Sequence, residues 1–341
     1  MDKKVILAVA GSGKSRLIID ELSANSKSLI FTYTEENYEQ LKNRVVAKFG
    51  KIPKGIRIYT YFSFIYSYCY RPLCTHELPC KGINFDLPVR FTKKDSPKHY
   101  FDEHQRIYSA RISKLLIVTE VIDEAIARLE RYFDSIYIDE VQDFSANDFN
   151  FLCYLAKSNL QITLVGDYYQ HTFNTSIDGN TKKGLYESME RYQNELEKGG
   201  YNIDKTSLSH SHRCSPDVCK FVTDNLGIEI YSHLTHSVKI ELIEDQSKID
   251  EIFNDSSTVK LFFQKSHLYK GNTSNWGKVK GLDNFNDVCI VLNSTSYKAY
   301  KAGKLRDLPP LTKNKLYVAC TRAKGNLYFV DEKKLKGFKK V

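Results

Sequence analysis

The stretch Ala8-Val9-Ala10-Gly11-Ser12-Gly13-Lys14-Ser15 lies between an apolar run and a segment with helical spacing. Residues 5–9 predict a short strand, and residues 14–21 predict the helix that follows the loop. Glycines in such a loop let backbone N–H groups turn inward around phosphate oxygens, and the helix adds the positive end of its dipole. The stretch therefore predicts a P-loop, the phosphate-binding turn between a strand and a helix.

The residue types of this loop indicate its chemistry. Lys14 is predicted to reach the β and γ phosphates of ATP, and the Ser15 hydroxyl to ligate Mg²⁺. Ala8 stands where a strict pattern has its first glycine, which is a mild departure. The predicted nucleotide-binding residues of the loop are Ala10, Gly11, Ser12, Gly13, Lys14, Ser15 and Arg16.

Two polar segments each follow a predicted strand and extend this site. Asp139 and Glu140 come after residues 135–138, so we expect Asp139 to hold Mg²⁺ and Glu140 to deprotonate the attacking water. Gln170 ends the stretch Gly166-Asp167-Tyr168-Tyr169-Gln170, which follows a strand at residues 161–165. It is predicted to sense the γ phosphate through a hydrogen bond. The three segments in this order predict ATP hydrolysis.

Alternating strand and helix patterns predict an α/β fold with parallel sheets covered by helices on both faces. We expect two domains, residues 1–203 and 204–341, with an insertion in the first at about residues 71–115. Further strands of the first domain are predicted at residues 28–33 and 56–60, with helices at 35–49 and 104–132. Those of the second are predicted at 239–243, 259–263, 287–292 and 326–330, with a helix at 311–323.

Composition narrows the class of protein. The 341 residues are 42% apolar, enough for packed cores, and the formal net charge of +9 suits a polyanionic partner without proving one. Apolar runs are too short to cross a bilayer and the start lacks a signal peptide, so we predict a cytoplasmic protein without membrane contact. Eight scattered cysteines fit a reducing compartment with no structural disulfide. Cys69, Cys74, His76 and Cys80 could form a zinc site, although their spacing is unlike a usual knuckle or ribbon.

The motif set closes with Tyr317-Val318-Ala319-Cys320-Thr321-Arg322-Ala323. In this order the motifs resemble those of superfamily 1 helicases of the UvrD, Rep and PcrA type, over nearly the whole chain. The resemblance implies that both predicted domains are RecA-like. The resemblance implies that Arg322, in motif VI, and Arg213, in motif IV, contact the γ phosphate. Asp283 stands at the ribose-binding glutamate position of motif V, but one added residue precedes Phe285.

The same resemblance implies a nucleic-acid surface. Residues 29–44 are similar to motif Ia and residues 59–64 to motif Ib, which in the family face single-stranded DNA. Thr34, Thr60 and Phe64 are therefore candidate DNA contacts, and Phe173 after Gln170 is a candidate for base stacking.

The resemblance implies an ATP-dependent DNA translocase or helicase with 3′ to 5′ polarity, using ATP and Mg²⁺ on single-stranded or forked DNA. Because the two arginines come from the second predicted domain, catalysis is expected to require domain closure. The large 2B insertion of relatives and most of 1B have no counterpart here. Two alternatives stay open: a regulatory ATPase that controls a partner nuclease, as in the bacterial antiviral Gabija system, or an RNA motor.

Overall fold

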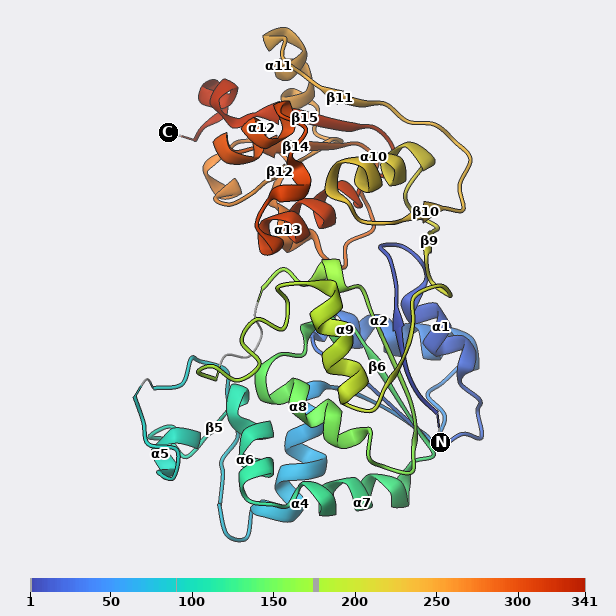
Figure 1. Ribbon diagram of the computed structural model, residues 1–341, viewed down its shortest axis with the longest axis vertical. Helices are drawn as coiled ribbons and strands as arrows, with labels where there is room; N and C mark the ends of the chain where they lie inside the picture. Colours follow the sequence, from blue (N-terminus) through green and yellow to red (C-terminus); the bar gives the residue numbers. More distant parts are fainter. Residues whose placement is uncertain (1, 90, 174–177, 341) are drawn as a thin grey trace. The chain divides into compact units, whose positions relative to one another are not determined.

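The computed structural model describes residues 2–89, 91–173 and 178–340, and Figure 1 shows their elements. The chain divides into two compact units. The first comprises Met1–Ile6, Ser15–Gly166 and Asn174–Asp204, and the second comprises Leu7–Lys14, Asp167–Phe173 and Lys205–Val341. Two short early segments thus belong by their contacts to the second unit. The domain limits inferred from sequence, which follow chain order, did not anticipate this.

The first unit contains a six-stranded sheet in the order β3-β2-β6-β7-β1-β8. Parallel pairs join β3 to β2, β2 to β6, β6 to β7 and β1 to β8. All residues of β2 and β6 are buried, as expected for strands covered on both faces. The strand bounds are β1 Lys3–Leu7, β2 Ser28–Thr32, β3 Ile56–Thr60, β6 Ser135–Asp139, β7 Gln161–Gly166 and β8 Asn202–Asp204.

Helices lie on both faces of this sheet. In Figure 1, α8 (Ala146–Leu155) and α9 (Met189–Lys198) lie in front of it and α2 (Glu35–Phe49) lies behind. The P-loop helix α1 spans Lys14–Glu21, as predicted. The predicted bounds of α2 are also confirmed, because Thr34 caps its start and Gly50, at φ +74°, ends it in the left-handed region.

The single helix predicted at residues 104–132 is wrong. That stretch contains β5 (Ile107–Tyr108), a 3-10 turn (Ser109–Arg111), α6 (Ile112–Val118) and α7 (Ile122–Tyr132). Glu120 adopts φ +61° and separates the two helices, because a left-handed residue cannot continue a right-handed helix. The Asp102 carboxylate accepts the N–H groups of His104 and Arg106, which makes a turn where the helix was expected to begin.

The predicted insertion contains short elements. They are α4 (Arg71–Cys74), β4 (Ile83–Asn84) and α5 (Pro97–Tyr100), and β4 pairs with β5 in parallel. Before them, α3 (Tyr61–Phe64) continues into a π-helix at Ile65–Tyr70.

The second unit contains a five-stranded sheet in the order β11-β15-β14-β12-β13, with every adjacent pair parallel. Its strands are β11 Ile240–Leu242, β12 Val259–Phe262, β13 Thr273–Asn275, β14 Val288–Leu292 and β15 Leu327–Asp331. Its helices are α10 Pro216–Leu226, α11 Gln246–Asn254, α12 Ser294–Lys301 and α13 Pro310–Cys320. Parallel β9 (His210–Ser211) and β10 (Tyr231–Ser232) form a separate small sheet.

The predicted fold class is confirmed: the protein is α/β, with parallel sheets flanked by helices. The core of the second unit joins α13 to β12, β14 and β15 and includes Ala10 of the P-loop. No helix in the described part of the chain is long and apolar enough to span a membrane. The eight cysteines, all in the described ranges, are free thiols.

Candidate functional site

The P-loop turns through two glycines with positive φ, Gly11 at +72° and Gly13 at +90°. A side chain at Gly11 would meet the Arg213 Cβ at 2.7 Å and the Ser211 Oγ at 2.8 Å. The N–H of His212 donates to the Gly11 carbonyl at 2.9 Å. Glycine is therefore required here both by its backbone conformation and by the close approach of the segment that carries Arg213.

The predicted phosphate-binding residues of the loop differ in their surroundings. Lys14 and Ser12 are buried, and the Ser12 hydroxyl donates to the Val9 carbonyl at 2.8 Å. The Ala10 N–H donates to the Tyr317 hydroxyl at 2.9 Å, so in this conformation it is directed at a side chain rather than at a phosphate. Arg16 is exposed and pairs with Asp20 at 3.4 Å along α1.

In the first unit, Ser15 and Asp139 lie together. The Ser15 hydroxyl donates to the Asp139 Oδ2 at 2.8 Å, and the Glu140 N–H donates to Oδ1 at 2.9 Å. Asp139 is 2% exposed, at the end of β6. A hydroxyl and a carboxylate are hard oxygen donors of the kind Mg²⁺ prefers, so this pair fits the predicted metal.

Glu140 is held in an uncommon conformation. Its φ of +58° and ψ of +45° place it in the left-handed region, which costs a non-glycine residue about 1–3 kcal/mol. The Gln142 side-chain amide donates to its carboxylate. This turn re-aims the Glu140 side chain immediately after the buried strand, at the position predicted for the general base.

Gln170 is bonded within its own segment of the second unit. Its amide nitrogen donates to the Asp167 Oδ2 at 2.9 Å, and both residues are buried. The same carboxylate oxygen accepts the Tyr317 hydroxyl at 2.9 Å. Asp167 and Tyr317 were not predicted as site residues, although both stand inside the quoted motifs.

Arg213 and Arg322 converge on one carboxylate in the second unit. Arg213 forms an ion pair with the Asp283 Oδ1, and the Arg322 Nη1 lies 3.8 Å from the same oxygen. Arg322 is 1% exposed and also donates to the Leu282 carbonyl at 2.8 Å. Burial, and next the nearby Arg213 charge, lower the pKa of Arg322 to about 10.

This convergence changes the expected role of Asp283. Asp283 was predicted to contact the ribose. Its carboxylate instead pairs with the two guanidinium groups that were predicted to bind the γ phosphate. The side chain is 58% exposed, so it can move away without opening the core. The two arginines and the P-loop segment belong to the same unit, which brings Lys14, Arg213 and Arg322 into one compact body.

Comparison with known proteins agrees with these motifs. The model of the viral superfamily 1 RNA helicase core domain matches residues 118–331. The chain belongs to this superfamily 1 helicase family. The match includes Asp139, Glu140 and Gln170 and both converging arginines, and it begins after the P-loop. It supports the superfamily 1 assignment, but it does not support the UvrD, Rep and PcrA type or the likeness to the Gabija helicase.

A solved structure of arterivirus nonstructural protein 10, a helicase in complex with DNA, is similar to this superfamily 1 helicase at a TM-score of 0.49 and 14% identity. The alignment covers 98% of this chain and 63% of that one, so the chain spans less than two thirds of that helicase. No curated protein matches the sequence.

The predicted nucleic-acid contacts of the chain lie in different environments. Thr34 and Thr60 serve as N-caps of α2 and α3, where their hydroxyls accept the N–H groups of Asn37 and Ser63. Phe64 is fully buried and stacks on Phe31, with ring centroids 4.6 Å apart and planes 8° apart. The prediction that Phe64 contacts DNA is therefore wrong, because no face of its ring is open to a base.

Phe173 has the opposite character. It is 49% exposed at the end of the segment Asp167–Phe173. Half of its surface is therefore open to solvent, and it remains the predicted base-stacking residue.

The possible zinc ligands do not form a site. Cys69 and Cys74 are buried, and burial raises the pKa of Cys74 to about 11, so its thiol stays protonated near neutral pH. Within residues 2–89, 91–173 and 178–340, no three His, Cys, Asp or Glu side chains are placed to hold a metal ion.

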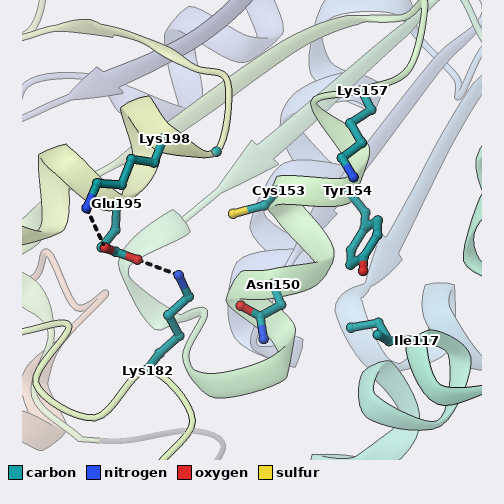
Figure 2. A pocket seen from close by; sticks show the side chains of 9 residues that line it. Ile117, Asn150, Cys153, Tyr154, Lys157, Lys182, Glu195 and Lys198 are labelled. Carbon is teal, nitrogen blue, oxygen red and sulfur yellow. Dashed lines mark hydrogen bonds and ion pairs between the residues drawn. The ribbon is translucent and has the colours of Figure 1, made fainter.

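A pocket of about 380 Å³ lies elsewhere in the first unit, and none of its lining residues is a predicted site residue. Figure 2 shows Lys182 and Lys198 directed at the Glu195 carboxylate, which pairs with both. Lys157 lies over the Tyr154 ring at 4.6 Å. The pocket's lysines are thus already engaged by protein groups.

Proposed function

We propose that this helicase core is an ATP-driven motor that moves along single-stranded nucleic acid and can thereby separate strands. The observation that carries the proposal is the convergence of Arg213 and Arg322 on a single carboxylate in the unit that also contains Lys14. Two guanidinium groups aimed at one oxygen provide a receptor for a phosphate anion. In phosphoryl transfer, such arginines raise the rate by roughly 10³ to 10⁵.

The P-loop connects the two halves of the proposed reaction. Lys14 and Ser15 are consecutive, yet Lys14 groups with the second unit and Ser15 with the first. Ser15 and Asp139 would hold Mg²⁺, which neutralises charge on the phosphates when bound. Lys14 would contact the phosphates, and Glu140 would accept a proton from the attacking water. A triphosphate bound to this loop would contact the consecutive residues Lys14 and Ser15, and its hydrolysis could thereby be converted into movement.

We propose DNA as the track, as the motif resemblance implies, with 3′ to 5′ polarity. RNA is the second candidate, and the description of the matched family as an RNA helicase core favours it. The proposed catalytic residues would not distinguish DNA from RNA, because they are expected to contact only the ATP. The 2′-hydroxyl is what a protein must read to do so.

The test is ATP turnover with Mg²⁺ in the presence of poly-dT, poly-U, forked duplex or no nucleic acid, at a stated salt concentration because binding falls steeply with salt. We expect at least one single strand to stimulate turnover. The matched control Glu140→Gln should bind nucleotide and fail to turn it over. Equal rates with and without every nucleic acid would refute the motor. Purification from the native host tests the nuclease-partner alternative separately.

A further inference from the structure

Helix α13 makes a direct hydrogen bond to the P-loop backbone. The Tyr317 hydroxyl, on a side chain with no exposed surface, accepts the Ala10 N–H at 2.9 Å. Ala10 belongs to the same hydrophobic core as Tyr317. Any change in the path of the first turn of the P-loop therefore alters a bond to α13.

The same hydroxyl donates to the Asp167 carboxylate at 2.9 Å. Asp167 Oδ2 also accepts the Gln170 amide at 2.9 Å, and Oδ1 accepts the Tyr169 N–H at 3.1 Å. A tyrosine hydroxyl has a single proton to donate, and here Asp167 receives it while the oxygen accepts from Ala10. The P-loop and the predicted γ-phosphate sensor Gln170 are thus connected through two side chains, those of Tyr317 and Asp167.

A second bond ties α13 to the residues that lead to Phe173. Asn314, one helical turn before Tyr317 and 2% exposed, donates to the His171 carbonyl at 2.9 Å. Phe173 follows two residues later and is half exposed. Arg322 follows the other end of the helix, two residues after Cys320. One helix therefore contacts the phosphate loop, the sensor segment and the chain before the exposed aromatic ring, and leads directly to Arg322.

We propose that α13 is the coupling element of the motor, and that Tyr317 and Asn314 are positioning residues that relate nucleotide occupancy to the nucleic-acid contact at Phe173. The proposal rests on the proposed function and deepens it. The two hydrogen bonds of the Tyr317 hydroxyl fix the separation of Ala10 and Asp167. The Asn314 side chain fixes the position of the His171 carbonyl. When a bound triphosphate moves the P-loop or Gln170, α13 moves with them and displaces residues 171–173.

Two variants separate the bonds. Tyr317→Phe removes the hydroxyl and keeps the ring, and Asn314→Ala removes only the bond to His171. Tyr297→Phe is the matched control, because its hydroxyl bonds the exposed Glu244 at 3.0 Å in the same unit. We expect the ratio of poly-dT-stimulated to basal ATP turnover to fall about tenfold in Tyr317→Phe and about threefold in Asn314→Ala, with the control unchanged. The loss should appear in kcat at saturating poly-dT more than in KM for ATP.

A second readout does not depend on turnover. Trp276 is the sole tryptophan of the chain, is fully buried, and begins a 3-10 turn (Trp276–Val279) that packs on α13. A non-hydrolysable ATP analogue should change its fluorescence in the wild type and in the control, and should change it much less in Tyr317→Phe.

The outcomes distinguish the two claims. If the wild type shows no nucleic-acid stimulation with either poly-dT or poly-U, the proposed function fails, and the coupling role fails with it. If the wild type is stimulated and both folded variants keep the control's ratio and its fluorescence response, the coupling role alone is overturned. Should Tyr317→Phe not fold, Asn314→Ala decides by the same two measurements.

Discussion

Replacing Asp283 with asparagine removes one negative charge from between Arg213 and Arg322 and keeps the size of the side chain. In the structure, the Asp283 carboxylate partly neutralises the two guanidinium cations, and Arg322 is only 1% exposed. A surface ion pair is worth about 0–1 kcal/mol and breaking a buried one costs about 3–5 kcal/mol. Because Asp283 is 58% exposed, we expect Asp283→Asn to lower the free energy of unfolding by about 1–2 kcal/mol.

The same variant should bind a triphosphate more tightly. In the wild type, a γ phosphate must displace Asp283 from both arginines, and the work of that displacement weakens binding. An asparagine amide binds the two arginines more weakly than the carboxylate does, so displacing it costs about 1–2 kcal/mol less. The affinity for a non-hydrolysable ATP analogue should therefore be about 5- to 30-fold higher. ADP, which lacks the γ phosphate, should show much less of this gain.

Calorimetric titration of both nucleotides, with melting curves of the free protein, measures these effects. If Asp283 instead binds the ribose, both nucleotides lose affinity in the variant. Weaker binding of the ATP analogue in a folded Asp283→Asn protein would therefore refute the displacement argument.

Three further predictions concern the loop, the aromatic residues and a buried acid. Gly11→Ala should abolish nucleotide binding and should destabilise the protein by more than ~1–2 kcal/mol, the cost of a left-handed alanine by itself. Gly50→Ala is the control, because open space surrounds it, and thermal melts should show only the ~1–2 kcal/mol backbone cost there. Phe64→Ala should cost about 3–5 kcal/mol of stability as a core truncation, whereas Phe173→Ala should weaken single-strand binding by about 1–3 kcal/mol at unchanged melting temperature. Burial raises the pKa of Asp148 to about 7, so from about pH 4 to 7 the folded protein holds a proton that the unfolded chain has lost. Unfolding free energy should thus fall as pH rises through that window, and Asp148→Asn should flatten the slope; an unchanged slope would contradict this origin.

Sequence patterns located those elements that depend only on residues close together in the chain. The P-loop, the helix after it and the buried strand before Asp139 could be located because apolar runs, glycines and caps act over a few residues. Helix 104–132 failed because the same apolar spacing hides Glu120, whose left-handed backbone no pattern indicates. The DNA contact predicted for Phe64 is wrong for a related reason. An aromatic side chain can pack in a core or stack on a base, and only its neighbours decide which; here Phe64 stacks on Phe31.

The sequence by itself predicted the reaction class, because Lys14, Glu140 and Gln170 each follow a predicted strand at short spacing. Tertiary structure alone decided that β7 lies between β1 and β6 in the sheet, that the P-loop segment packs with the second unit, and that Asp283 pairs with both arginines. The hydroxyl of Tyr317 acquires its two partners only there, since Ala10 and Asp167 lie 307 and 150 residues away along the chain. The physical reason is that hydrogen bonds and ion pairs depend on distance in space, which residue spacing encodes only within a single helix, strand or turn.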